Sequence, residues 1–321
     1  MNYIGELISM AVAVSWTVAA LASEVGSRHL GVFVMNVWRM AVTLALSAVL
    51  MVIVFGAPWP VYAGGEAWMW LLLSGVVGYF FGDWCLFNSY LTIGSRMGQL
   101  FMTLAPMFTA IFAWLMLGQT LSWSALLAMV VTLSGIAISV LGRGEHHSFS
   151  LQLPTKGILF GIGAGLGQGV GLVLSKLGLD RYTADVPVDM LPEVENILPF
   201  GANMVRCVAG LVCFSFFYIC MQRVHKHHGD GSSQKTFCAS FNDHRGLLAM
   251  VVAVFSGPFI GVSMSLMAVQ YTAAGIASTI MAMTPIIILL PSRYLFGQPI
   301  TVKSIVGAVV SCLGVSLFFL L

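Results

Sequence analysis

The sequence predicts an all-α membrane protein of ten transmembrane helices, built from two inverted five-helix repeats. Three observations lead to this fold class. Of the 321 residues, 59% are hydrophobic and only 8% are charged, whereas soluble domains carry roughly 25% charged residues. The apolar residues fall into segments of about 20, which is the length that a membrane-spanning helix needs. The second half of the chain also repeats the spacing of the first.

The repeat is clearest around two prolines, Pro106 and Pro285, which lie 179 positions apart. Glycine and proline constrain the backbone, so their agreement at one offset is not an effect of composition. Self-similarity at a fixed offset indicates a duplicated unit. With this offset, Gly78 falls on Gly257, Gly82 on Gly261, Gly118–Gln119 on Gly297–Gln298, and Gly135 on Gly314.

The repeat extends toward the start of each copy with smaller offsets. Ser23–Gly26 aligns with Ser175–Gly178 at an offset of 152, and Asn36–Arg39 aligns with Asn203–Arg206 at an offset of 167. The offset grows because the second copy has insertions near 180–200 and 222–245, in polar stretches that are typical of loops. We therefore divide the chain into a first repeat, 1–150, and a second repeat, 151–321.

Each repeat contains five apolar segments, separated mostly by short turns such as Pro58–Pro60 and Gly118–Gln119. Because five is odd, the two copies must cross the membrane in opposite directions. Such inverted repeats are typical of secondary transporters, whose site lies near the midplane between the copies. The ten expected spans are 4–23, 33–55, 67–89, 96–117, 122–141, 156–178, 199–221, 246–268, 273–296 and 301–320.

Lysine and arginine are distributed very unequally between the two sides of this topology. Short loops rich in these residues face the cytoplasm, so the side with ten of them is expected to be cytoplasmic and both termini to lie outside. The opposite loops hold only Lys176 and Arg181. The ten are Arg28, Arg96, Arg143, Lys156, Arg223, Lys226, Lys235, Arg245, Arg293 and Lys303.

These features together resemble the EamA-type transporters of the drug/metabolite transporter superfamily. The resemblance rests on the five-span repeat, the proline inside each fourth span, the Gly-Gln pair that ends it, and glycine in each fifth span. The family usually has Gly-Glu at the end of the fourth span, so Gln119 and Gln298 depart from its pattern. The resemblance implies a secondary transporter that moves a small metabolite or drug by alternating access, in export or exchange.

The resemblance also implies the partners of such a carrier. We expect a small-molecule substrate, a lipid bilayer, and a coupled proton or counter-solute, in the plasma or inner membrane of the cell. A monomer and a homodimer are both compatible with the sequence, and no cofactor is expected. A net charge of +2 without a basic tail predicts no nucleic-acid partner.

Polar side chains inside the spans are the candidate substrate-binding residues. Asp83 is foremost, because an ionisable group within a span usually faces a cavity or a partner. The alternative for the others is interhelical hydrogen bonding. The full set is Trp16, Tyr79, Asp83, Asn88, Gln99, Gln168, Ser263, Gln270 and Tyr271.

Four charged residues are candidates for gating. Glu24 and Lys176 occupy equivalent ends of the first and sixth spans, where charges often only mark the membrane interface. Arg39 and Arg206 are equivalent residues about 10 Å inside their spans. Inversion would place Arg39 toward the cytoplasm and Arg206 toward the other side, where each either snorkels to headgroups or steadies one closed state.

Pro106 and Pro285 are expected to kink their spans, because proline removes a backbone hydrogen bond. We expect both kinks to border the central cavity. Glycines at 157, 161, 165 and 169 lie on one helical face and predict close helix packing, with a hinge as the alternative; no dinucleotide-binding motif is present.

Other classes of function have weaker support in the sequence. The histidines at 146–147 and 225–228 are more typical of solvated loops than of a metal site, and the six scattered cysteines contain no Cys-x-x-Cys. We expect the protein not to be an enzyme. An intramembrane enzyme and a non-transporting sensor or scaffold remain as the alternatives.

Overall fold

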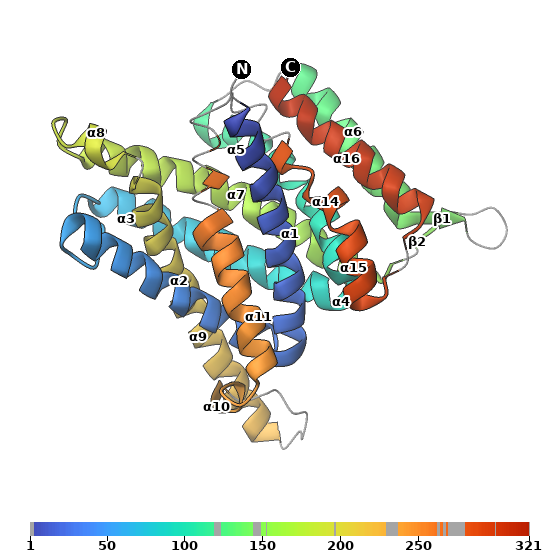
Figure 1. The fold of residues 1–321 in the computed structure, drawn as a ribbon, viewed down its shortest axis with the longest axis horizontal. Coiled ribbons are helices and arrows are strands. Elements are labelled where there is room, and N and C mark those ends of the chain that lie inside the picture. The colour runs from blue at the N-terminus through green and yellow to red at the C-terminus, as the bar shows by residue number, and fades with distance from the viewer. Residues whose placement is uncertain are drawn as a thin grey trace.

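The computed structural model describes residues 3–118, 123–143, 149–151, 153–195, 197–228, 237–261, 264–265, 268, 280–298 and 300–320. Most of these residues are helical, and the helices pack side by side in one body (Figure 1). The two ends of the described chain lie at the same end of the molecule in this view. A short hairpin of two strands, β1 (Leu141–Arg143) and β2 (Phe149–Leu151), is an addition to the expected all-helical fold.

The first repeat begins with two long helices and continues with several shorter ones. Gly31 alone separates its first two helices, and its third, fourth and fifth elements follow one another without a gap. The elements are α1 (Ile4–Leu30), α2 (Val32–Phe55), α3 (Gly65–Ser74), η1 (Gly75–Gly82), α4 (Asp83–Met102), α5 (Ala105–Leu117) and α6 (Trp123–Val140).

The second repeat has the same order of long and short elements, with short helices added in its two polar insertions. These additions are α8 (Leu191–Val194) and α10 (Phe237–Ser240). The other elements are α7 (Thr155–Asp185), α9 (Leu198–His228), α11 (His244–Val254), η3 (Phe255–Phe259), α14 (Thr284–Ile287), α15 (Leu289–Phe296) and α16 (Val302–Leu320).

Five helices among the described residues are long and apolar enough to cross a membrane: Ile4–Leu30, Val32–Phe55, Gly65–Met102, Thr155–Asp185 and Leu198–Arg223. The third of these contains Gly94, whose φ of 82° and ψ of 157° are not helical. Gly31, which separates α1 from α2, has nearly the same angles, φ 81° and ψ 154°. Gly94 therefore divides the long helix where the sequence predicts the end of the third span.

In the described part of the chain, five shorter apolar helices, of 10–17 residues, overlap other expected spans. They are Ala105–Met116, Leu126–Val140, His244–Phe259, Thr284–Phe296 and Val302–Leu317. Two of them begin with the repeated prolines: Pro106 lies in the first turn of α5, directly after a break at Thr103–Leu104, and Pro285 lies in the first turn of α14, after a break at 282–283. Both helices are thus interrupted just before these prolines, and the expectation that the interruptions border a central cavity stays a prediction.

A π-helix occurs at equivalent places in the two repeats. η1 occupies Gly75–Gly82, and η3 occupies Phe255–Phe259, which falls within the same stretch when the 179-residue offset is applied. Single π-helical turns inside α-helices are frequent at functional sites. Asp83 is the first residue after η1, so the irregular turn ends at the most polar position of this helix.

Close helix packing by the glycines of α7 is confirmed, on two faces of the helix rather than one. On the face toward the third span, a Cβ at Gly167 would lie 2.6 Å from Cα of Gly82, and one at Gly171 would lie 2.7 Å from Cα of Gly78. On the expected face, a Cβ at Gly169 would lie 2.7 Å from the carbonyl oxygen of Ala105. Glycine lets α7 lie backbone to backbone against both helices.

The helices α6 and α16, which are equivalent in the two repeats, pack along their length. Their contact is reciprocal: Gly135 of α6 meets Ser311 of α16, and Gly314 of α16 meets Thr132 of α6. Adding the 179-residue offset turns Gly135 into Gly314 and Thr132 into Ser311, so each contact is the counterpart of the other. The fold therefore has an internal two-fold relation at this contact.

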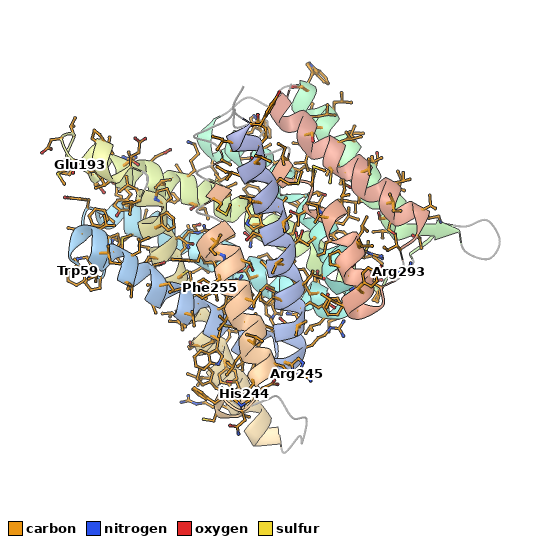
Figure 2. All side chains as sticks on the ribbon, viewed as in Figure 1. Trp59, Glu193, His244, Arg245, Phe255 and Arg293 are labelled. Atoms are coloured by element: carbon orange, nitrogen blue, oxygen red, sulfur yellow. The ribbon has the colours of Figure 1, made fainter. Side chains whose placement is uncertain are left out.

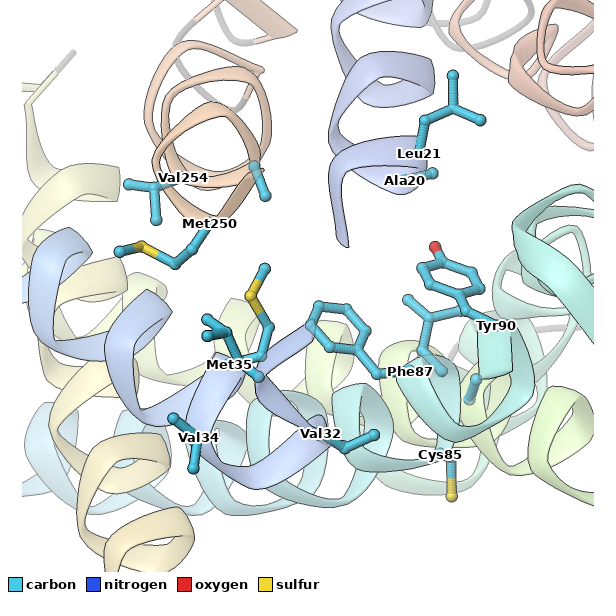
Figure 3. Packing of buried hydrophobic residues seen from close by; sticks show 14 of the residues in the cluster. Ala20, Leu21, Val32, Val34, Met35, Cys85, Phe87, Tyr90, Met250 and Val254 are labelled. Atoms are coloured by element: carbon cyan, nitrogen blue, oxygen red, sulfur yellow. The ribbon is translucent and has the colours of Figure 1, made fainter. Parts of the chain in front are cut away.

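Large apolar side chains cover much of the outer surface; Ile53 is 75% exposed and Leu7 is 70% exposed. Inside, a cluster of buried side chains from α1, α2, α4 and α11 fills the space between the repeats (Figure 3). Phe87 and Tyr90 of this cluster stack with ring centroids 5.7 Å apart. This core supports the polar site on α2 and α4.

Candidate functional site: a buried charge cluster between the repeats

The centre of the molecule contains a buried ion pair between the spans of the first repeat. Arg39 of α2 donates a hydrogen bond from Nη2 to Oδ2 of Asp83 on α4, and these residues are 9% and 3% exposed. The Arg39 guanidinium also lies over the ring of Phe87, 4.8 Å from its centroid. A charge-assisted bond between two buried groups fixes both side chains in place.

The second repeat supplies the next member of the cluster. Gln168 of α7 donates from Nε2 to Oδ1 of Asp83 at 2.8 Å, and the same nitrogen lies 3.3 Å from the carbonyl oxygen of Gly78. Gln168 reaches these groups because its neighbour Gly167 lies directly against Gly82. The close packing of α7 on η1 therefore brings an amide to the carboxylate.

A second group of side chains joins η1 to α9. Tyr79 donates its hydroxyl hydrogen bond to Oδ1 of Asn203, and the guanidinium of Arg206 lies over the Tyr79 ring, 4.5 Å from its centroid. Arg206 and Arg39 both act electrostatically on Asp83. We call Arg39, Tyr79, Asp83, Gln168, Asn203 and Arg206 the central cluster.

The central cluster carries more positive than negative charge. It has two guanidinium groups and one carboxylate, and among the described residues Arg206 has no ion pair. The Nε atoms of Arg39 and Arg206 are buried without hydrogen-bond partners in the described part of the chain. An unneutralised charge inside a membrane protein is costly and marks a functional position.

Arg39 and Arg206 both lie close to the carboxylate of Asp83 rather than far apart, and the closed state that each would steady stays a prediction. A residue about 10 Å inside a span is only about 5 Å short of the midplane of a bilayer core of about 30 Å. Long side chains entering from opposite sides therefore meet near the middle. Arg39 does not extend to headgroups but is bonded to Asp83.

Glu24 forms a separate buried cluster at the far end of α1. Its carboxylate accepts hydrogen bonds from Arg28 Nη2 at 2.6 Å and from the backbone N–H of Ser95 at 2.6 Å, and Glu24 is 0% exposed. Ser95 follows Gly94 and begins a new helical arm, whose N-terminus favours a negative charge. Gly94 in turn contacts the side chain of Gln298, so both repeats meet here.

The model of the EamA-like transporter family matches residues 3–141 and 155–320. The chain belongs to the EamA-like transporter family. Members are membrane transporters of the drug/metabolite type and not enzymes, so this EamA-like protein is an integral membrane protein.

Solved structures share the fold of this EamA-like protein. One of them, titled "Crystal structure of protein", superposes with a TM-score of 0.57 at 14% sequence identity, over 100% of this chain and 98% of that chain. No curated protein sequence matches the chain significantly. At this level of identity the likeness concerns the fold alone.

The structure of the EamA-like protein brings together three of the expected substrate-binding residues, Tyr79, Asp83 and Gln168. Asn88 instead donates to the carbonyl of Trp84 in its own helix, at 2.7 Å, and Gln99 donates to the hydroxyl of Tyr90 at 2.6 Å. These bonds are structural contacts of the kind the sequence left as the alternative.

Other expected residues of the EamA-like protein lie away from the central cluster or outside the described residues. Trp16 of α1 packs where α1 meets η3, and its indole would lie 2.7 Å from a Cβ at Gly261. Lys176 is exposed and pairs with Asp180 at 3.6 Å, so it does not share the burial of Glu24. Ser263, Gln270, Tyr271 and Gln119 are outside the described residues.

Three contacts in the EamA-like protein were not expected from its sequence. The alignment of Asn203 with Asn36 singled out this residue in the sequence. Its hydrogen bond with Tyr79 joins the two repeats, however, and no sequence spacing predicts that contact. Arg28 had a signal as a partner of Glu24, because it lies four residues later on the same helix, whereas Ser95 had none. In the described ranges, no group of three or more His, Cys, Asp or Glu side chains could hold a metal, and the side chains of the two histidine groups lie outside these ranges.

Proposed function

We propose that the protein is a ten-span secondary carrier with two inverted repeats, 1–150 and 151–321. In this proposal it moves a small metabolite or drug-like solute across the plasma or inner membrane by alternating access, in export or exchange. The observation that supports this most strongly is the central cluster. It draws polar side chains from α2, η1 and α4 of the first repeat and from α7 and α9 of the second.

Alternating access requires a site whose contacts change when one repeat moves against the other. The bonds from Gln168 to Asp83 and from Tyr79 to Asn203 cross between repeats, whereas the pair of Arg39 and Asp83 stays within the first. A relative motion would therefore break the first two bonds and keep the third. The ion pair would travel with its own repeat.

Helix irregularities in both repeats support such a motion. The π-helices η1 and η3 and the two breaks before Pro106 and Pro285 occur at equivalent positions. Backbone groups freed at these places need partners from neighbouring helices or from water in a cavity. We propose that they border the transport pathway and flex during each cycle.

We propose that both termini lie outside the cytoplasm. The ten-to-two distribution of lysine and arginine supports this orientation. The two chain ends lie at the same end of the molecule in Figure 1, which agrees with an even number of spans. Figure 2 shows His244 and Arg245 at the end of the molecule near α10, while Glu193 lies near α8. A C-terminal reporter that is active only in the cytoplasm should stay inactive.

The test of the proposed function is solute movement by the purified protein in proteoliposomes. A panel of labelled neutral, cationic, zwitterionic and anionic metabolites is offered, with empty liposomes and with a denatured sample as controls. A carrier accumulates or exchanges at least one solute without changing it, whereas an enzyme alters the solute chemically. If no solute moves faster than in empty liposomes, or if the solute is converted, the proposed function is wrong.

A further inference from the structure

Among the residues that the structure describes, Arg206 differs from the other arginine of the central cluster in having no ion-pair partner. Arg39 is paired with Asp83. At the position of the second repeat that is equivalent to Asp83, the sequence has Val262. Arg206 is half-buried; its guanidinium lies over the Tyr79 ring, and its Nη2 would lie 3.2 Å from a Cβ at Gly78. The arginine is thus present in both repeats, whereas the carboxylate is present at this position in the first repeat alone.

Among the described residues, the two acidic residues that are buried, Glu24 and Asp83, are both already bonded to other groups. Glu24 is bonded to Arg28 and to the backbone of Ser95. Asp83 already accepts bonds at both oxygens, from Arg39 and from Gln168. Among the described helices the site therefore keeps an excess of one positive charge at a depth where such a charge is expensive.

The geometry around Arg206 suits the binding of an oxyanion. A guanidinium stacked on an aromatic face uses its flat side for the ring, so its N–H groups at the edge stay directed outward in the plane. Its Nε is buried without a hydrogen-bond partner among the described residues. An arginine of this kind recognises carboxylate and phosphate groups through two parallel hydrogen bonds.

We propose that Arg206 is the recognition residue for the negatively charged group of the substrate, and that the substrate is a small organic solute with one oxyanion, a carboxylate or a phosphate ester. This inference rests on the proposed carrier function and names its substrate class. The bound oxyanion neutralises the excess charge of the central cluster. The ring of Tyr79 holds the guanidinium in place, and Asn203 fixes that ring by accepting a hydrogen bond from the Tyr79 hydroxyl.

The first experiment measures binding to the purified full-length protein by thermal unfolding in detergent, because a ligand of the folded state raises Tm by mass action. The probes are two matched pairs at fixed ionic strength: benzoate with benzamide, and glycerol 3-phosphate with glycerol. At least one anion should raise Tm in a saturable way, and its neutral partner should not. The pair that responds distinguishes a carboxylate from a phosphate substrate.

Variants then assign the effect to Arg206. Arg206→Gln should weaken binding of the anion about ten-fold or more, and Arg206→Lys should restore only part of it because lysine lacks the planar fork. Arg181→Gln is the matched control, since it removes the same charge from an exposed residue. If Arg206→Gln does not fold, the lysine variant alone carries the test.

The outcomes separate this inference from the proposed function. No saturable response of the wild type to either anion, or an unchanged response in both Arg206 variants, overturns the anion site. In the proteoliposome panel, movement of neutral or cationic solutes alone also overturns it and leaves the carrier function intact. Anion binding without movement of any solute overturns the carrier function and leaves the anion site intact.

Discussion

Replacing Asp83 with asparagine isolates the contribution of the buried ion pair. Asparagine keeps the size of the side chain and an oxygen for Gln168 but removes the charge that faces Arg39. The central cluster then holds two guanidinium groups and no carboxylate. Breaking a buried pair by removing one partner costs about 3 to 5 kcal/mol. The free energy of unfolding of a typical protein is only about 5 to 15 kcal/mol, so this cost is a large part of it. We expect a marked loss of stability, and transport below that of the wild type.

The assay is a double-mutant cycle measured by thermal unfolding in detergent. Arg39→Gln alone should also destabilise the protein, whereas the double variant of Arg39→Gln and Asp83→Asn should be more stable than the sum of the single losses implies. A coupling of about 1 kcal/mol or more is expected for two groups in contact. The reasoning is refuted if the stability losses of the two single variants simply add in the double variant. It is also refuted if the Asp83→Asn protein is as stable as the wild type.

Three further predictions concern other parts of the fold. Glu24→Gln should lower stability by about 1 kcal/mol in thermal unfolding, because its partner arginine is half in solvent and such pairs are worth little; a loss as large as that of Asp83→Asn would contradict this. Gly167→Val should cost about 3 kcal/mol by forcing α7 from η1, while Gly65→Ala, with no atom within 4 Å of its Cβ, should leave expression and Tm unchanged. Pro106→Ala and Pro285→Ala each restore a backbone N–H and should slow the initial rate of transport at normal abundance; full rates in both would show that the breaks do not serve the cycle.

The sequence was informative wherever the backbone decides the structure. Pro106 and Pro285 interrupt their helices as expected, and the glycines of α7 give the expected close contacts. These residues act through local sterics and through the missing N–H, so their effect depends little on distant parts of the chain. Gly94 likewise marks the end of the third span, because its positive φ suits glycine.

The composition of the central cluster could not be predicted in the same way. Tyr79, Asp83 and Gln168 were candidates on polarity alone, but their partners depend on which helices pack together. Arg206 is 123 residues from Asp83 along the chain, and it acts on that carboxylate because α9 packs against η1. The π-helices have no clear sequence signal, since the lengthened turn is stabilised by tertiary contacts.

The reciprocal contact of α6 with α16 has a consequence for the origin of the protein. A contact in which Gly135 meets Ser311 and Gly314 meets Thr132 is the isologous interface of a homodimer. Two separate five-helix chains inserted in opposite directions could form the same contact. Such a symmetric ancestor would carry any carboxylate twice. Two copies joined in one chain are free to differ, as Asp83 and its counterpart Val262 do, and one arginine then has no ion pair among the described residues.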